Sequence, residues 1–421
     1  MLAEAARLYA EVHREPELSG AEERTAARFG DRLRTAGYEV ATGVGGHGVV
    51  GVLRRGEGPT VLLRAELDAL PVREATGLPY ASTVTEPVPV MHACGHDAHL
   101  ACVAGAAHAL AADAGGWRGT LVVVGQPAEE TLTGAAAMLA DGLYERFPAP
   151  GVVLAQHTVP LPAGMVAHTE GPLLAASATV EVVLHGRGGH ASAPHLAVDP
   201  VVAAAALVLR LQTIVSRETG PGEPLVLTVG SLHAGGAGNV IPESAVLEVT
   251  LRAFAPRTLD RALAAVRRIV HAEAAASGAD RDPEVREVAR SAATVNDPVA
   301  GAAVRRAHER AFGARRVTRW QPSTATEDFP LLGPAGEHLH GVAGIRSAYW
   351  MLGSVGPEQW AAAGATAAQR LAALPANHSP RFRPHPRLTL TTGIQAMTAA
   401  ARTHLAAVDA ESPVPQRPPT F

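Results

Sequence analysis

The chain has 421 residues, of which 47% are hydrophobic, so it can bury a large core and is long enough for two or three domains. Its formal net charge is −4 and no long run of one sign occurs, which argues against nucleic acid or an anionic membrane as the main partner. All 36 basic residues are arginine, and the absence of lysine excludes Schiff-base chemistry, lysine-bound pyridoxal phosphate and a Walker-type phosphate loop.

The number of cysteines and the length of the apolar runs bear on where in the cell the protein is expected. The two cysteines, Cys94 and Cys102, are too few to form the disulfide framework of a secreted protein of this length. The first ten residues lack the apolar run of a signal peptide, and no uninterrupted apolar stretch of about 18 residues could span a bilayer. We therefore expect a cytoplasmic protein that has no membrane partner.

The first part of the chain shows strands that alternate with helices. Helical spacing of apolar residues covers the first 40 positions, and an alanine-rich helix is predicted over residues 97–112. Short apolar runs predict strands at residues 48–53, 60–67, 119–126 and 152–156. This alternation favours a mostly parallel sheet that is covered on both faces.

The order of elements changes after about residue 176. Strands and helices are predicted in the order βαββαβ, at residues 179–185, 199–215, 225–232, 245–254, 259–275 and 283–289. This order is typical of a ferredoxin-like domain with a four-stranded antiparallel sheet. After about residue 291 the helix–strand alternation resumes, so the second domain is predicted to be inserted within the first.

These patterns predict an α/β protein with a defined domain order. A mixed, mostly parallel sheet would form one domain from residues 1–176 and 291–410. The βαββαβ domain at 177–290 would be inserted within it. Residues 411–421, which hold four prolines among polar residues, are predicted to be a disordered tail.

Metal-binding side chains cluster at residues 91–99, just before and within the start of the predicted helix. Cys94, His96, Asp97 and His99 are the types of residue that bind borderline divalent cations. The alternative is a buried cysteine beside a helix-capping aspartate and surface histidines. This segment alone does not decide between the two interpretations.

Possible partners for this cluster follow two other apolar runs. Glu129 and Glu130 come after the strand predicted at 119–126, and His157 ends the run at 152–156. Ligands and catalytic groups gather at the carboxyl ends of strands in open α/β sheets. His378 lies in a turn-rich Asn-His-Ser-Pro segment. Taken singly, the two glutamates are typical of a charged loop and each histidine is typical of a structural residue.

The whole set of motifs resembles the M20 metallopeptidase family, within it the branch of aminoacylase-, hippurate- and auxin-conjugate-type amidohydrolases. That family has a metal-binding α/β domain with an inserted βαββαβ lid that often dimerises, so the resemblance implies the same fold and a homodimer through the lid. The motifs that carry the resemblance occur in a fixed order at residues 13–19, 63–71, 76–80, 94–97, 126–130, 186–191, 238–242, 327–329 and 378–380.

The resemblance also implies roles for individual residues. Five side chains would bind two divalent ions (Zn²⁺, Mn²⁺ or Co²⁺), and the sequence does not say which ion each of them binds; they are Cys94, His96, Glu130, His157 and His378. Glu129 would be the general base, and Asp68 would orient a metal-binding side chain. His190 would reach the active site of a neighbouring subunit and stabilise the oxyanion, and Asn239 would contact substrate.

Arg252 is a further candidate for substrate binding. Its guanidinium group matches a substrate carboxylate, although a surface arginine on a strand is an equally good interpretation.

We therefore predict an enzyme that hydrolyses the amide bond of N-acyl amino acids or related small amides. Glu129 would accept a proton from a metal-activated water. Two alternatives remain open: a dipeptidase or carboxypeptidase with the same metal chemistry, and a non-catalytic binding protein that has kept the fold. An N-carbamoyl amino acid is a less favoured substrate.

Overall fold

The computed structural model describes residues 1–113 and 115–406, which form two compact units. The first unit comprises Met1–Gly171, Asn296–Trp320 and the described part of Leu331–Phe421. The second comprises Pro172–Val295 and Gln321–Pro330. The tail predicted at 411–421 lies outside the described residues.

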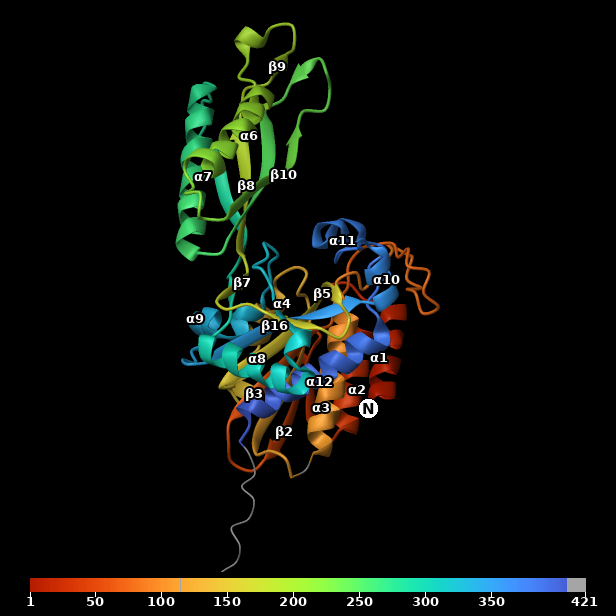
Figure 1. Cartoon of the computed structure of the whole chain (residues 1–421). Helices are drawn as coiled ribbons and strands as arrows, with labels where there is room; N and C mark the ends of the chain where they lie inside the picture. Colours follow the sequence, from red (N-terminus) through yellow and green to blue (C-terminus); the bar gives the residue numbers. More distant parts are fainter. Residues whose placement is uncertain (114, 407–421) are drawn as a thin grey trace, which may run out of the picture. The chain divides into compact units, whose positions relative to one another are not determined.

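The first unit is built on an eight-stranded mixed sheet with the strand order β1-β2-β4-β3-β5-β16-β6-β15 (Figure 1). The pairs β4–β3, β3–β5 and β5–β16 at its centre are parallel, whereas β1–β2 and β2–β4 at one edge are antiparallel. The strands are β1 (Glu39–Val44), β2 (Gly48–Arg55), β3 (Thr60–Glu66), β4 (Gly119–Gln126), β5 (Val152–Pro162), β6 (Val166–His168), β15 (Val317–Arg319) and β16 (Arg346–Val355).

Helices cover this sheet, and their buried faces form the main core with it. The α-helices of the first unit are α1 (Leu2–Arg14), α2 (Glu23–Thr35), α3 (His96–Ala112), α4 (Gly134–Ala140), α5 (Leu143–Arg146), α8 (Pro298–Phe312), α9 (Glu337–His340), α10 (Pro357–Ala362), α11 (Ala367–Ala373) and α12 (Pro386–His404). Helix α3 is buried on nearly all sides, because its many alanines allow α1, α12 and the sheet to approach closely. The first residue of this central helix is His96.

In the second unit, the four strands of the main sheet and the two helices that pack on them follow the order βαββαβ. Its main sheet is antiparallel with the order β10-β12-β8-β13, and α6 and α7 pack on it. Buried residues alternate with exposed ones along β12, as expected for a sheet with one covered face. The elements are β7 (Pro172–Leu174), β8 (Ala176–His185), β9 (Gly189–His190), α6 (Pro200–Arg217), β10 (Leu225–Ala234), β11 (Val240–Ile241), β12 (Ser244–Ala253), α7 (Pro256–Ala276), β13 (Glu284–Ser291) and β14 (Thr294–Val295).

Helix α6 is long and apolar enough to cross a bilayer by length and composition, with a mean hydropathy of 1.4 over 18 residues. Arg210 interrupts the apolar sequence of this helix, so the helix does not count as an uninterrupted apolar run. Leu207, Leu211 and Ile214 are buried against the rest of the unit. This pattern favours an amphipathic helix that covers a sheet over a membrane span.

The sequence prediction was wrong about where β5 ends. The strand was expected to stop at residue 156, which would place His157 just beyond its end, but β5 continues to Pro162. Residues after His157 keep pairing with β16, and His157 itself lies opposite Met351. His157 is therefore inside a strand, where backbone pairing on one side restrains it.

Candidate metal centre

Three neighbouring parallel strands bring candidate residues to one region of the first unit. Asp68 lies two residues past the end of β3, and Glu129 lies three residues past the end of β4. These strands are in register up to the pair Glu66 and Gln126. Because β5 runs parallel to β3 on its other side, His157 comes to the same region.

The segment before α3 supplies a cysteine and a histidine. Cys94 precedes the helix and His96 is its first residue, separated by Gly95 at a φ of 86°. A β-carbon at Gly95 would clash with Oγ1 of Thr158, so the segment packs closely on β5. Glycine is required at this position for both reasons.

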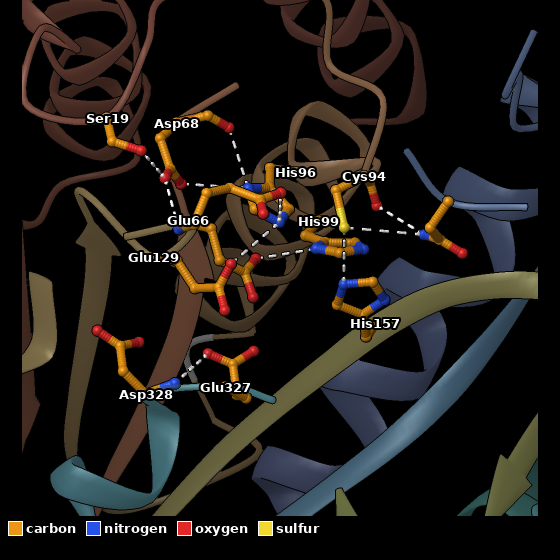
Figure 2. A network of polar contacts seen from close by, with 12 residues as sticks. Ser19, Glu66, Asp68, Cys94, His96, His99, Glu129, His157, Glu327 and Asp328 are labelled. Carbon is orange, nitrogen blue, oxygen red and sulfur yellow. Dashed lines mark hydrogen bonds and ion pairs between the residues drawn. The ribbon is translucent and has the colours of Figure 1, made fainter. Parts of the chain in front are cut away.

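The five predicted metal ligands converge. Sγ of Cys94 lies 3.4 Å from Nε2 of His157. Nε2 of His96 lies 3.7 Å from Oε1 of Glu130, and Oε2 of Glu130 lies 3.6 Å from Nε2 of His378. Figure 2 shows several of these side chains pointing toward one another.

The candidate ligand atoms form two groups that share the thiol. The first group is Cys94, His96 and His157, and the second is Cys94, Glu130 and His378. In each group the ligand atoms lie within 4.8 Å of one another. Two sites with a common cysteine match the composition expected of a dinuclear centre.

Asp68 connects two of these ligands. Its Oδ1 and its backbone carbonyl lie 3.2 and 3.0 Å from Nδ1 of His96, which donates to them. Its Oδ2 accepts from Oγ of Ser19 at 2.8 Å and from the backbone N–H of Glu130 at 2.9 Å. A proton held on Nδ1 leaves Nε2 of His96, the atom that faces the cluster, as the one available to a cation.

The ligand set fits divalent cations. Nε2 of His96 and Oε1 of Glu130 are buried and have no hydrogen-bond partner. Donors about 2.0–2.3 Å from one tetrahedral cation stand about 3.3–3.8 Å apart. The pair Cys94–His157 in the first group, at 3.4 Å, and the pair Glu130–His378 in the second, at 3.6 Å, have such separations. Imidazole, thiolate and carboxylate together suit a borderline ion such as Zn²⁺.

Burial shifts the pKa values of two candidate ligands. Burial raises the pKa of the Cys94 thiol to about 12, with His96 opposing the shift. Burial also lowers the pKa of His157 well below its usual range, and the nearby His99 adds to this effect. His157 is therefore neutral, the form that binds metal, whereas Cys94 must lose its proton when a cation binds.

His99 restrains the strand that carries His157. Nδ1 of His99 donates to Oε2 of Glu66 at 2.8 Å, and the backbone N–H of Thr158 donates to its Nε2 at 2.8 Å. Nδ1 of His157 donates to the carbonyl of Thr158 at 2.9 Å, so its Nε2 carries the lone pair toward Cys94. The imidazole of His99 thus holds the backbone beside a ligand without being one of the five.

The fifth candidate ligand, His378, lies on a turn that is hydrogen-bonded to the cysteine segment. His378 has a φ of 69°, and its N–H donates to the carbonyl of Ala93 at 2.8 Å. The neighbouring Asn377 donates from Nδ2 to the carbonyls of Cys94 and Thr158, at 3.1 and 3.0 Å. These contacts fix the turn against the rest of the site.

A buried histidine also anchors the start of α3. Nδ1 of His13 lies 2.6 Å from Oδ2 of Asp97, and its Nε2 lies 3.1 Å from Oε1 of Glu74. Burial alone would lower the pKa of His13, but the two carboxylates outweigh this and raise it to about 9. His13 is therefore charged at neutral pH and links α1 to the helix that begins with His96.

The other three predicted site residues lie on the second unit. His190 is exposed on β9, which pairs with β11, and the N–H of Ala191 donates to the carbonyl of Asn239 at 3.1 Å. The structure thus brings His190 and Asn239 together. Arg252 lies apart from them on β12, and its Nη1 donates to the carbonyl of Thr324 at 2.7 Å.

Sequence reasoning missed several residues that support the ligands. Ser19, His99 and Asn377 all lie in or beside motifs that were recognised, but none was given a role. For Ser19 the available signal was its place in the 13–19 motif, just before a helix. Its contact with Asp68 spans 49 positions of sequence, so only the folded chain reveals it.

Comparison with known proteins places this chain in a family. Residues 62–363 match peptidase family M20/M25/M40. A hippurate hydrolase from Campylobacter jejuni is 41% identical over 246 residues, which cover 58% of this chain and 63% of that protein. An N-acetyl-L-cysteine deacetylase from Bacillus subtilis is 40% identical over 245 residues, which cover 58% of each protein. The match thus spans less than two thirds of the length of these relatives.

A solved structure extends the similarity to nearly the whole chain. The crystal structure of a dinuclear metal-binding peptidase of family M20 from Bacillus subtilis is 26% identical. It has a TM-score of 0.75 and covers 96% of this chain and 98% of that one. The mixed α/β fold and the resemblance predicted from the motifs are both confirmed. The chain belongs to peptidase family M20/M25/M40.

Proposed function

We propose that this protein hydrolyses the amide bond of N-acyl amino acids or similar small amides, with two divalent cations bound in the first unit. The observation that carries the proposal is the convergence of five candidate ligands into two groups that share Cys94. The names of the two relatives support the substrate class, since hippurate and N-acetyl-L-cysteine are both N-acyl amino acids.

We assign the two cation sites from the two groups of ligand atoms. Cys94, His96 and His157 would bind one ion, and Cys94, Glu130 and His378 would bind the other. Cys94 belongs to both groups, so its thiolate would help to hold both ions. Zn²⁺, Mn²⁺ and Co²⁺ all accept this mixture of sulfur, nitrogen and oxygen ligands.

The bound ions would lower the pKa of a shared water and polarise the amide carbonyl. Glu129 is the proposed general base, because one of its carboxylate oxygens lies 3.7 Å from Nε2 of His96, at the edge of the ligand cluster. Its carboxylate would accept the proton of the attacking water and return it to the departing amine. Asp68 would hold His96 in the tautomer that binds metal.

The second unit is the proposed source of substrate contacts. His190 would donate to the tetrahedral oxyanion in the site of a neighbouring subunit, a contribution of about 3–4 kcal/mol for one donor. Asn239, beside it, would contact the substrate. Arg252 is the weakest of these candidates, since one of its guanidinium nitrogens already donates to a backbone carbonyl. A cytoplasmic homodimer through this unit completes the proposal.

A metal-reconstitution assay tests the function. The protein is stripped with a chelator, reloaded with Zn²⁺, Mn²⁺ or Co²⁺, and assayed for amine release from acetyl, benzoyl and longer-acyl amino acids, with dipeptides in parallel. We expect metal-dependent release from the acylated amino acids. Faster release from dipeptides would indicate a peptidase, and no hydrolysis of any amide by fully loaded protein would refute the proposal.

A further inference from the structure

The turn that carries Glu129 has an unusual backbone. Ala128 has a φ of 51° and Leu132 a φ of 57°, in the left-handed region that residues with a β-carbon seldom adopt. The carbonyl of Ala128 accepts from the N–H groups of Thr133 and Gly134, at 3.2 and 3.1 Å. Such a conformation persists only where the surrounding contacts impose it.

The side chain of Glu22 supplies one of those contacts. Its Oε1 accepts from the backbone N–H of Ala128 at 2.8 Å and from the N–H of Gly20 at 2.9 Å. Glu22 is fully buried, and its Oε2 has no hydrogen-bond partner. No basic side chain pairs with it among residues 1–113 and 115–406.

Glu22 does not serve its own helix. It occupies the N-cap position of α2, yet its side chain makes no capping hydrogen bond there. Burying a carboxylate that has no cationic partner is costly, and a neutral cap such as serine would begin a helix equally well. The contact with the turn, 106 positions away in sequence, is therefore what the carboxylate contributes.

We infer that Glu22 is a positioning residue for the general base. By holding the N–H of Ala128 it fixes the left-handed residue just before Glu129, while Asp68 fixes the N–H of Glu130 just after it. The base is thereby restrained from both sides. This inference rests on the proposed function, because it takes Glu129 to be the base.

Substitution of Glu22 separates positioning from folding and from metal binding. Glu22→Ala lets the turn relax and should lower kcat by about 30–100-fold, since a displacement near 1 Å can cost about a hundredfold. KM should stay within about threefold, and both ions should be retained. Glu22→Gln keeps an acceptor oxygen and should recover most of kcat. The matched control is Glu23→Ala, at the exposed glutamate next in sequence.

A glycine at the strained position provides a second test. Because glycine adopts positive φ without strain, Ala128→Gly added to Glu22→Ala should restore at least about tenfold of the lost kcat. A purely structural role of Glu22 in α2 would produce no such rescue. Should Glu22→Ala not fold, Glu22→Asp keeps the charge, shortens the reach and should lower kcat by about tenfold.

Hydrogen exchange gives a readout that does not depend on turnover. In metal-loaded protein, the amides of residues 127–134 should exchange at least about tenfold faster in Glu22→Ala than in wild type, with Glu23→Ala unchanged. Unchanged exchange together with an unchanged kcat would overturn the inference. If wild type hydrolyses no amide, the proposed function fails, and exchange alone still decides whether Glu22 holds the turn.

Discussion

Replacing Asp68 with asparagine tests whether this residue sets the tautomer of His96. Asparagine has nearly the same shape but only one acceptor oxygen. That oxygen can keep the two hydrogen bonds that Oδ2 accepts from Ser19 and from the backbone of Glu130. The side-chain NH₂ group must then face Nδ1 of His96, where the aspartate accepts a hydrogen bond in the native protein.

The expected loss of metal affinity follows from the conflict between two hydrogen-bond donors, the NH₂ group of the asparagine and Nδ1–H of His96. The backbone carbonyl at position 68 still accepts from Nδ1 of His96, but the new NH₂ group opposes a proton on Nδ1 and so favours the tautomer with the proton on Nε2, the atom that faces Glu130. Protonated Nε2 cannot bind a cation. Loss of such an orienting carboxylate typically weakens metal binding by about 10–100-fold, or about 1.4–2.7 kcal/mol. We expect this loss at the site that contains His96.

Competition with a chromophoric chelator at pH 7 would measure both dissociation constants. Ser19→Ala is the matched control, because it removes one hydrogen bond to Asp68 and leaves the acceptor that faces His96. We expect this control to weaken binding by less than about threefold. Wild-type affinity for both ions in Asp68→Asn would refute the assignment of Asp68 as the residue that orients His96.

Three further predictions concern the base, a glycine and a buried histidine. Glu129→Gln should retain both ions but lower kcat by about 10³-fold or more, measured by turnover beside metal analysis. Gly95→Ala places a β-carbon against Thr158 at a backbone φ of 86°. This variant should lower the free energy of unfolding by about 2 kcal/mol or more and impair metal binding. His13 has its pKa raised from 6.5 to about 9, so its stabilisation is complete below pH 6.5 and is lost as the pH rises through 9. The unfolding free-energy difference between wild type and His13→Gln, measured in urea on metal-free protein, should shrink by roughly 3 kcal/mol over this range.

Each of these predictions has a contrary outcome. A rate near wild type in Glu129→Gln would assign the base elsewhere. Gly77→Ala is the control for Gly95, since Gly77 also has a positive φ, of 69°, but open space around it. Equal losses in the two alanine variants would show that backbone strain, and not the contact with β5, matters. If the unfolding free-energy difference between wild type and His13→Gln stays constant with pH, His13 is not charged in the folded protein.

The sequence predicted the central strands well, because strands buried on both faces read as continuous apolar runs. Residues 119–126 were predicted as a strand and β4 has those bounds. The end of β5 was missed, since His157 and Thr158 interrupt the apolar run while the backbone pairing with β16 continues. The hydrophobic pattern of a sequence indicates which residues are buried, whereas the residue at which a strand ends depends on backbone pairing with the adjacent strand.

Some residues of the candidate site could be recognised from local sequence, and others could not. Cys94 and His96 could be singled out locally, because their spacing places both at the start of a helix. His378, nearly 300 positions away, was noted in a turn-rich segment, but its role as a ligand came from the resemblance. The supporting roles of His99, noted only as one of the metal-binding types, and of Glu22 were missed, because the role of a buried histidine or glutamate shows only when its partner is known. Their contacts span 59 and 106 positions.

The contacts of the ligands suggest why the site should bind cations tightly. Nδ1 of His96 and the N–H of Glu130 are both held by Asp68, and the N–H of His378 donates to a backbone carbonyl. The imidazole of His96 and the backbone of Glu130 and His378 are therefore held by contacts within the chain itself. Desolvation raises the pKa of Glu130, so the buried acid gains most when a positive charge enters. Since ions bind the folded chain and not the unfolded one, the free energy of binding adds directly to the stability of this unit.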